Sequence, residues 1–509
     1  MQGPGIISRF EDEDPTSFWA TNMWILRSLI KLSVLFFIVF VGWVVNRYVR
    51  MVLQRRALGL SGPPILPVLG SMMEFARITA ANNDLVLRVH EEFKRLYGKT
   101  YSYFIGPRQY VVFENLDDAQ EILIKQFANF TDREPMDFIH SSLNSALVAQ
   151  KGHAWRGQRN RISPAFTTAK LRKMELAIQD KVDLLVSNIG ECADSAKEWD
   201  AFRAFKCLTL DVIADVAFAI PSSCQDDPND AFLFHASTFF ANMPDPRSNP
   251  LMAVSREWLV QRVREAVRTR LANPTDRTDL ISLLLPEDSI VDDDVEDTVV
   301  ANCFAFLLAG YETTSTALAF TTWLLAKHED VQQTLYEEIE DLDLEDAETR
   351  YDVLMKAPYL NAVFKEALRL FPPITFFVNR TCVTETNIGG VPMKPGTVAC
   401  VPVWNIHRDE RVWAEADSFL PERFLSSTPH HPLAWIPFGG GPRKCVGSRF
   451  AELEIKAALV QVVRHFRLRT APGNEEMELR NPTVLLAPKE VRTLVERRED
   501  ANANTVIVQ

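Results

Sequence analysis

The chain has 509 residues, of which 47% are hydrophobic, and a formal net charge of −12. This acidic balance, without a basic tract that carries interleaved aromatic residues, argues against nucleic acid as a partner. No linker or repeat divides the chain after residue 70, so we expect one large domain there. The seven cysteines show no CxxC spacing, which argues against a zinc site or a disulfide framework and favours a reducing compartment.

The first predicted element is a membrane-spanning helix over residues 24–46. No charged residue occurs between Leu32 and Asn46, and extension back to Trp24 gives a helix about 33 Å long. That length spans an endoplasmic reticulum bilayer, which is about 27 Å thick, with some tilt. Acidic residues precede the helix and arginines follow it, so we predict a lumenal tail at 1–23 and a cytosolic remainder. A cleaved signal peptide is the main alternative, but the apolar run is long and begins late.

Residues 47–70 are basic and then rich in proline, and we predict a hinge there. Prolines stiffen a linker and would set the angle between the anchor and the following domain. From residue 71 to residue 509 the pattern is mainly helical, with short strand-like runs such as Tyr101–Ile105 and Gln109–Phe113. We therefore predict a mainly α domain that contains small β-sheets.

A long helical pattern from about Asp294 to Lys327 is interrupted by Gly310 and by the run Glu312-Thr313-Thr314. Glycine inside a helix costs about 1 kcal/mol relative to alanine, and threonine competes for backbone carbonyl groups. We therefore expect a loosened turn with a functional reason. An acid beside an alcohol can relay protons. The alternative is a surface carboxylate next to space-filling threonines.

The most informative segment is the cysteine loop, residues 438–447, with the sequence Phe-Gly-Gly-Gly-Pro-Arg-Lys-Cys-Val-Gly. Its glycines allow a sharp turn and a close approach to a flat ring. A helix is predicted from Ser448, so Cys445 would lie near a helix N-terminus, which favours an anionic sulfur. A thiolate presented in this way can bind haem iron. The alternative is a buried structural cysteine.

Three motifs together resemble the cytochrome P450 family. The cysteine loop matches F-x-x-G-x-R-x-C-x-G at Phe438, Gly441, Arg443, Cys445 and Gly447. Residues 366–369 match E-x-x-R and residues 421–424 match P-E-R-F, in the order of the family. The resemblance covers about residues 61–496 and implies the cytochrome P450 fold, preceded here by one transmembrane helix. It also implies a buried structural network of Glu366, Arg369 and Arg423.

The resemblance implies haem b as the cofactor and Cys445 as the axial ligand of its iron. The other residues that it places against haem are Phe438, Trp155, Arg159, Arg380 and Arg443. Arginine suits the haem propionates because its planar group donates two parallel hydrogen bonds to a carboxylate. The resemblance assigns the proton relay to Glu312 and Thr313. His407 is expected to be an ordinary hydrogen-bonded histidine and not an axial ligand.

The resemblance locates a substrate pocket by regions, which are 132–149, Phe304 with Leu308, 374–378 and 484–486. These regions are mostly apolar or aromatic, so a lipophilic substrate is expected. Residues 231–258, whose apolar side chains include Met243, resemble a lid over the access channel that dips into the membrane. For any single aromatic residue of this span, an ordinary place in the helical core is an equally good interpretation.

The implied function is a monooxygenase of the endoplasmic reticulum membrane that hydroxylates or epoxidises a lipophilic small molecule. Electrons would come from NADPH through NADPH-cytochrome P450 reductase, with cytochrome b5 as a further candidate partner. The reductase would dock near Cys445, where Lys444, Arg156 and Arg161 supply positive charge. One alternative is a haem-thiolate isomerase or dehydratase that acts on a peroxide, although such members typically depart from the acid and alcohol pair. The other is a non-catalytic membrane protein that binds haem or a steroid.

Overall fold

Helices dominate the computed structural model, and the strands are short. The model describes residues 15–83, 85–134, 141–227, 229–242, 250–273, 279–285, 293–375, 377–426, 430–480 and 485–498. The prediction of a mainly α domain with small sheets and one N-terminal apolar helix is confirmed.

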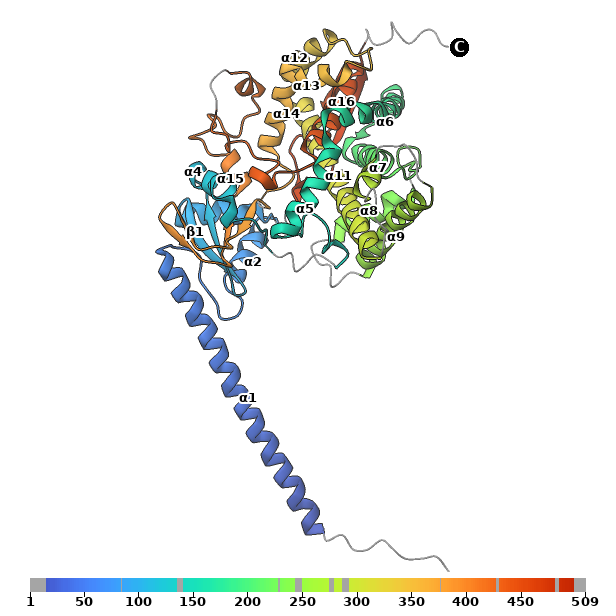
Figure 1. Ribbon diagram of the computed structural model, residues 1–509. Helices are drawn as coiled ribbons and strands as arrows, with labels where there is room; N and C mark the ends of the chain where they lie inside the picture. The colour runs from blue at the N-terminus through green and yellow to red at the C-terminus, as the bar shows by residue number, and fades with distance from the viewer. Residues whose placement is uncertain are drawn as a thin grey trace, which may run out of the picture.

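The N-terminal helix α1 (Pro15–Leu58) extends away from the rest of the molecule (Figure 1). Its residues 23–58 are long and apolar enough to cross a membrane, and their side chains are mostly exposed, as at Phe36. The helix continues well past Asn46, so the arginines that follow the apolar run are helical as well. It ends at Leu58, before Gly59, whose φ of 67° lies in the left-handed region that favours glycine.

The segment after α1 is packed against the domain. Met51, near the end of α1, is buried in a cluster with Ile65 and Phe104. The Ser102 N–H donates to the Ser61 carbonyl at 3.0 Å. A Cβ atom on Gly62 would lie 1.9 Å from the Ser102 carbonyl oxygen, so only glycine fits there. The last turns of α1 are therefore attached to the catalytic domain through tight contacts.

The largest sheet has four strands in the order β1-β2-β7-β4. Strand β2 pairs with β1 in antiparallel and with β7 in parallel orientation, and β4 pairs with β7 in antiparallel orientation. Tyr101 lies opposite Val112, so the strands predicted around these residues are confirmed. The strands are β1 (Thr100–Ile105), β2 (Arg108–Phe113), β3 (Trp199–Asp200), β4 (Asn379–Thr381), β5 (Thr386–Ile388), β6 (Val391–Met393), β7 (Val398–Cys400), β8 (Phe466–Thr470), β9 (Leu479–Arg480), β10 (Ala487–Pro488) and β11 (Arg492–Arg497).

Most of the described domain is built from the helices that follow α1. They are α2 (Met72–Ala81), α3 (Leu87–Tyr97), α4 (Leu116–Gln120), α5 (Gly152–Ile162), α6 (Thr168–Asp194), α7 (Ala201–Phe218), α8 (Ala231–Asn242), α9 (Pro250–Ala272), α10 (Leu280–Leu284), α11 (Asp293–Lys327), α12 (Glu329–Glu340), α13 (Arg350–Lys356), α14 (Pro358–Leu370), α15 (Val403–His407) and α16 (Ser448–His465). Two short helical segments also contribute to the site. One is the π-helix η1 (Glu121–Lys125), which is wider than an α-helix, and the other is the 3₁₀ helix η6 (Gly441–Arg443), which is narrower.

The long helix α11 passes through the centre of the domain (Figure 1). Acidic residues in its first turn and Lys327 in its last turn complement the helix dipole. Nearly every side chain from Val299 to Ala326 is buried, because α11 packs against α7, α9, α14 and α16. A helix that is buried all round needs no polar face, which explains why the apolar pattern here has little periodicity.

Candidate active site

The cysteine loop folds into a tight turn ahead of α16. The Cys445 N–H donates to the Phe438 carbonyl at 2.9 Å, and Gly439 and Gly441 have φ values of 73° and 68°. A Cβ atom on Gly441 would lie 1.8 Å from the carbonyl oxygen of Leu123 in η1. The neighbouring backbone therefore requires glycine at position 441. The reason expected from the sequence for the glycines of this loop was a different one, namely the close approach of a flat ring.

Cys445 lies three residues before Ser448, where α16 begins. Burial raises the pKa of its thiol, while a backbone hydrogen bond with Gly447 and the charges of Arg159, Arg133 and Lys444 act to lower it. Among the seven cysteines, all of which belong to the described residues, only Cys445 has an exposed side chain. The Cys445 sulfur is therefore surrounded by protein, but a bound molecule can still reach it. A metal ligand needs this access.

Two of the predicted arginines are buried beside this loop. Arg443 donates from Nε to the Thr131 carbonyl at 2.7 Å, and its guanidinium lies 4.4 Å from the centre of the Trp155 ring. Arg380 donates to the carbonyls of Asn379 and Gly440, and its buried Nε has no hydrogen-bond partner within the described part of the chain. Burial lowers the pKa of Arg443 to about 9, and it lowers that of Arg380 well below the usual range.

Arg133 belongs to the same cluster, although no motif in the sequence identified it. It donates to the carbonyls of Phe377 at 3.0 Å and Arg443 at 3.3 Å. Burial lowers its pKa to about 10, while the charge of the Cys445 sulfur acts to raise it. Sequence reasoning placed this position only within a pocket region, because its partners lie more than 240 residues away.

Arg159 completes a set of four arginines around Cys445. It is half-buried, and burial lowers its pKa while Cys445 acts to raise it. Within the part of the chain that the structure describes, Arg133, Arg159, Arg380 and Arg443 form no ion pair with a carboxylate, and we name this set the arginine cluster. Burying several like charges is costly unless an anion compensates them. The arginine cluster therefore suits an anionic ligand.

No bare metal ion fits the described residues, because they contain no group of three or more His, Cys, Asp or Glu side chains that could hold one. A single cysteine can still bind a metal that brings its other ligands with it. Phe438 is the first residue of the cysteine loop, and its ring centre lies 6.4 Å from that of Phe364 and 6.1 Å from that of Trp435. Phe438 thus links the loop to α14.

The helix α11 is continuous through Gly310, so the loosened turn expected there is not present in the structure. A Cβ atom on Gly310 would lie 3.0 Å from the Cδ1 atom of Ile213. The glycine therefore allows α7 to pack closely against α11. The Thr313 hydroxyl donates to the Ala309 carbonyl at 2.6 Å, which satisfies it within the helix.

Glu312 is fully buried and points toward α7 and β9. Its Oε1 accepts a hydrogen bond from Arg480 at 3.0 Å, and its Oε2 lies 3.4 Å from Nζ of Lys206. Successive residues of an α-helix point about 100° apart, and Glu312 and Thr313 have different partners. The structure therefore does not bring these two side chains together, and the partners of Glu312 were not foreseen from the sequence.

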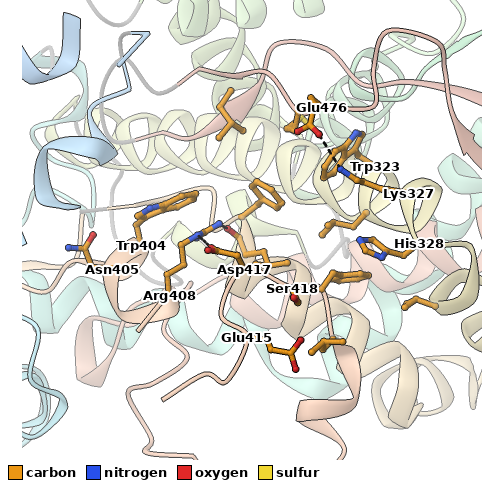
Figure 2. Close-up of a pocket in the computed structure, with 18 of the residues that line it drawn as sticks. Trp323, Lys327, His328, Trp404, Asn405, Arg408, Glu415, Asp417, Ser418 and Glu476 are labelled. Atoms are coloured by element: carbon orange, nitrogen blue, oxygen red, sulfur yellow. Dashed lines mark hydrogen bonds and ion pairs between the residues drawn. The ribbon is translucent and has the colours of Figure 1, made fainter. Parts of the chain in front are cut away.

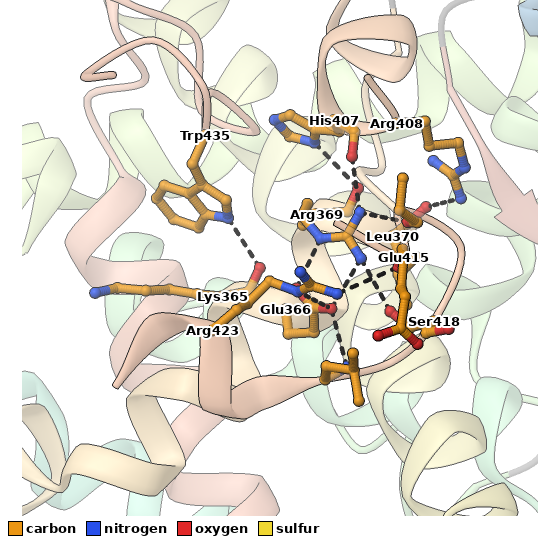
Figure 3. Close-up of polar contacts among 12 residues, drawn as sticks. Lys365, Glu366, Arg369, Leu370, His407, Arg408, Glu415, Ser418, Arg423 and Trp435 are labelled. Carbon is orange, nitrogen blue, oxygen red and sulfur yellow. Dashed lines mark hydrogen bonds and ion pairs between the residues drawn. The ribbon is translucent and has the colours of Figure 1, made fainter. Parts of the chain in front are cut away.

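The predicted buried network of Glu366, Arg369 and Arg423 is confirmed (Figure 3). Glu366 and Arg369 are fully buried and form two hydrogen bonds of 2.7 and 2.8 Å. Arg423 donates from Nε to Glu366 at 2.9 Å. Arg369 also donates to the carbonyls of His407, Ala416 and Ser418, which ties α14 to the loop that follows α15.

His407 is an ordinary buried histidine, as predicted. Its Nδ1 lies 3.1 Å from the Arg369 carbonyl, and its Nε2 accepts the Ile436 N–H at 2.9 Å. Burial lowers its pKa to about 3, and the positive charges of Arg369 and Arg408 act in the same direction. The ring is therefore neutral near pH 7 and is engaged through both nitrogens, which leaves none for a metal.

Two of the predicted pocket regions meet in the structure. Ile374 and Leu485 form an isolated β-bridge, and the Leu486 N–H donates to the Pro373 carbonyl at 2.8 Å. Phe304 and Leu308 are buried on α11. The remaining predictions, at residues 135–140, Phe376 and Val484, lie outside the described residues.

The predicted lid corresponds to α8 and α9, with residues 243–249 outside the described part. Helix α8 covers α11, because the ring of Phe239 lies 6.0 Å from that of Phe304 and the ring of Phe240 lies 5.8 Å from that of Tyr311. Phe234 and Leu251 are instead exposed. The aromatic residues of this span are therefore divided between the core and the surface.

A cleft of about 1130 Å³ lies elsewhere, beside α15 and the loop at 415–422 (Figure 2). Trp404 and Arg408 form part of its wall, with the guanidinium 3.3 Å from the ring centre. It contains none of the catalytic or haem-binding residues predicted from the motifs. The cleft adjoins the Glu366 network, because Arg408, Glu415 and Ser418 line the cleft and are also drawn beside the network (Figures 2 and 3).

Comparison with known proteins identifies the chain. The model of the family described as Cytochrome P450 matches residues 60–495. The chain belongs to the cytochrome P450 family. This cytochrome P450 is therefore a haem-thiolate monooxygenase, and haem is the cofactor that the family implies. The predicted family, fold class and enzyme class are confirmed.

The similar proteins include several animal cytochromes P450. Cytochrome P450 3A12 of Canis lupus familiaris is 30% identical, over 88% of this chain and 93% of its own length. Cytochrome P450 3A6 of Oryctolagus cuniculus is 31% identical, over 81% of this chain and 86% of its own length. The putative cytochrome P450 cyp-13B1 of Caenorhabditis elegans is 28% identical, over 81% and 89% respectively. The similarity thus extends over nearly the whole catalytic domain.

Proposed function

We propose that this cytochrome P450 inserts one oxygen atom from O₂ into a lipophilic substrate, by hydroxylation or epoxidation, with electrons from NADPH supplied through NADPH-cytochrome P450 reductase. The observation that carries the proposal is the arginine cluster, whose four cations have no carboxylate partner among the described residues and lie in or next to the loop that carries the accessible Cys445 thiol. Haem has the matching chemistry, since its iron takes a thiolate and its propionates take guanidinium groups.

In this proposal Cys445 would ligate the haem iron through its sulfur, and the four arginines would hold the haem propionates. The backbone hydrogen bond with Gly447 and the nearby positive charges favour the anionic sulfur. Trp155 supports Arg443 through a cation–π contact, and Phe438 packs the start of the loop against Phe364 of α14. The unpaired Nε of Arg380 supports the assignment, because a buried donor without a partner costs about 1–3 kcal/mol until a ligand satisfies it. Haem, when bound, supplies the activation of dioxygen.

Thr313 and Glu312 are proposed to deliver the protons that this chemistry consumes. The Thr313 oxygen can accept a hydrogen bond, because the hydroxyl now donates its only proton to the Ala309 carbonyl. To pass that proton on, the hydroxyl must turn away from the carbonyl, and it regains a proton from the donor that its oxygen accepts. Glu312 is held by Lys206 and Arg480 on the side of α7 and β9. Its carboxylate must therefore leave these cations before it can act together with Thr313.

The substrate is proposed to be lipophilic because apolar side chains of α8 and α11 meet at the N-terminal side of Gly310 on α11. Phe239 packs on Phe304, and Leu308 is buried on the same helix. Walls of this kind bind apolar molecules and leave orientation to a few polar groups.

The proposed partners and location follow from charge and from α1. Lys444, Arg156 and Arg161 are exposed near the cysteine loop and could receive an acidic surface of the reductase or of cytochrome b5. The apolar residues 24–46 of α1 are proposed as a single-pass anchor in the endoplasmic reticulum membrane, after a lumenal tail at 1–23. Residues 47–70 are proposed to link the anchor to a cytosolic catalytic domain at 71–509.

A product screen tests the proposal. Microsomes that contain the full chain and the reductase are supplied with NADPH and lipophilic substrate classes, and products are identified by mass spectrometry. We expect products that have gained one oxygen atom from labelled O₂. Turnover of a hydroperoxide without any NADPH consumption would instead support the isomerase or dehydratase alternative.

The variant Thr313→Ala tests the proton relay in the same assay. Removal of a positioned proton donor typically slows a reaction by a factor of about 10² to 10⁴. We expect retained haem and NADPH consumption that is diverted from product to hydrogen peroxide. Thr334→Ala, on the exposed face of α12, is a matched control and should leave product formation unchanged. Full coupling in Thr313→Ala would show that the proton path lies elsewhere.

A further inference from the structure

A second cleft, of about 630 Å³, lies between α7, α8 and β9. Its lining includes Phe202 and Lys206 on α7, Phe234 on α8, and Arg480 on β9. Lys206 and Arg480 are the two cations that hold Glu312. The cleft therefore connects the protein surface with the buried acid of α11.

The cleft has more positive charge than its acids compensate. Lys206 and Arg480 share the single carboxylate of Glu312, and no other carboxylate within the described ranges pairs with either of them. The acids of the lining have partners of their own, since Asp200 caps α7 and Glu490 pairs with Arg492 at 3.0 Å. One carboxylate between two cations leaves a position for a second anion.

The wall beside these cations is apolar. The ring centre of Phe202 lies 4.3 Å from Nζ of Lys206 and 5.9 Å from the guanidinium carbon of Arg480. Phe234, also in the lining, is 58% exposed. Cations at one end and aromatic surface at the other match a molecule with an anionic head and an apolar tail.

We propose that this cleft binds a lipophilic carboxylate, whose head group bonds to Arg480 and Lys206 and thereby releases Glu312. The side chain of Arg480 is 33% exposed, so a ligand can reach it from solvent. Arg480 makes the closer contact with Glu312, since it lies 3.0 Å from Oε1 whereas Nζ of Lys206 lies 3.4 Å from Oε2. Binding and the release of Glu312 do not depend on the proposed function. Only the consequence does, namely that the freed carboxylate can act together with Thr313.

Binding is tested with decanoate as the probe, by calorimetry on the full-length holoenzyme in lipid nanodiscs, after subtraction of empty nanodiscs. Decanol, which lacks the charge, and acetate, which lacks the tail, are the matched probes. A hydrogen bond to a charged group is worth about tenfold or more in affinity. We expect decanoate to bind, Arg480→Gln to weaken it at least tenfold, and Phe234→Ser to weaken it severalfold.

The control variant is Arg497→Gln, which removes an arginine that pairs with Asp194 at 2.6 Å on another strand. It should leave decanoate binding unchanged, and Arg480→Gln should leave decanol binding unchanged. Equal decanoate affinity in the wild type and in Arg480→Gln would overturn the site. An equal loss of decanol in Arg480→Gln would overturn the role of the head group.

The release of Glu312 is measured by difference infrared spectroscopy, without turnover. Decanoate labelled with ¹³C at its carboxyl group shifts its own bands away from those of the protein. We expect decanoate to change a carboxylate band that is absent in Glu312→Gln. If decanoate binds and no such band changes, the proposed release of Glu312 from Arg480 and Lys206 is refuted. If the band changes but no monooxygenation is found, the cleft stands and the proposed function fails.

Discussion

Two buried groups of arginines lie in this domain, and they are compensated in opposite ways. In the Glu366 network, two guanidinium groups surround one carboxylate and donate to backbone carbonyls as well. In the arginine cluster, the four guanidinium groups pair with no carboxylate among the described residues, and their hydrogen bonds go to backbone carbonyls. The first group is complete within the protein and serves as a brace. The second, in our proposal, becomes complete when it binds an anionic ligand.

The largest effect should come from breaking the complete group. Glu366→Ala leaves Arg369 buried without its carboxylate, and such a change typically costs about 3–5 kcal/mol. That is a large part of the stability of an ordinary domain. We expect little folded protein, measured as the yield of soluble haem-containing enzyme and by thermal unfolding.

The control for this prediction is Glu92→Ala. Glu92 and Arg95 have the same spacing of three residues as Glu366 and Arg369, but they are exposed, and exposed pairs contribute about 0–1 kcal/mol. A Glu366→Ala protein that is as stable as Glu92→Ala would contradict the assignment of the network as a brace.

A smaller effect of a different kind is expected in the arginine cluster. Arg380→Met removes a buried cation that has an unpaired Nε, so the haem-free protein should be as stable as the wild type or more stable. Haem should be lost faster, by about tenfold or more, because a hydrogen bond to a charged group is removed. Haem transfer to an acceptor protein and denaturant unfolding of the haem-free chain measure the two effects.

Arg156→Met is the control, since Arg156 lies next to Trp155 on α5 but is exposed. It should change neither haem loss nor stability. The contrast between the two groups would be refuted if Arg380→Met unfolded the haem-free protein and left haem retention unchanged.

The last effect is absent near neutral pH and appears only as the pH falls; it concerns His407, whose ring contacts the Arg369 carbonyl of the complete group. Its folded pKa of about 3 lies below the ordinary value of 6.5, so the unfolded chain binds the proton first as the pH falls. This residue therefore favours folding above pH 6.5, and the advantage is lost between pH 6.5 and about 3. The loss is about 1.4 kcal/mol per pH unit.

Unfolding by denaturant at a series of pH values should therefore show a weaker acid dependence in His407→Gln than in the wild type. The exposed His153 provides the control variant His153→Gln, which should keep the acid dependence of the wild type. Identical curves for all three proteins would show that His407 does not limit acid stability.

The sequence could predict the complete group because its spacing is local. Three residues on one helix place Glu366 and Arg369 on the same face, whatever the rest of the fold does. Arg133 could not be predicted in this way, since it meets Phe377 and Arg443 only through the folding of distant segments. The same holds for Glu312, whose partners come from α7 and β9.

The expected break at Gly310 illustrates a second limit. Helix propensity alone favours a loosened turn there, but the close packing of Ile213 explains the glycine within a continuous helix. Likewise, the apolar pattern defined the anchor to Asn46, whereas arginines, which are good helix formers, continue α1 to Leu58. The hydrophobic pattern alone therefore did not fix the continuity of α11 or the end of α1. Tertiary packing decided the first, and helix propensity decided the second.

The most direct test of the account is the spectrum of the reduced carbon monoxide complex of the full-length protein. If Cys445 is the axial ligand, the Soret band should lie at the strongly red-shifted position that thiolate ligation gives, and Cys445→Ala should lose haem or this spectrum. Cys192→Ala, which alters a cysteine on α6, should keep it. A band of native protein at the position typical of histidine ligation would contradict the assignment of Cys445.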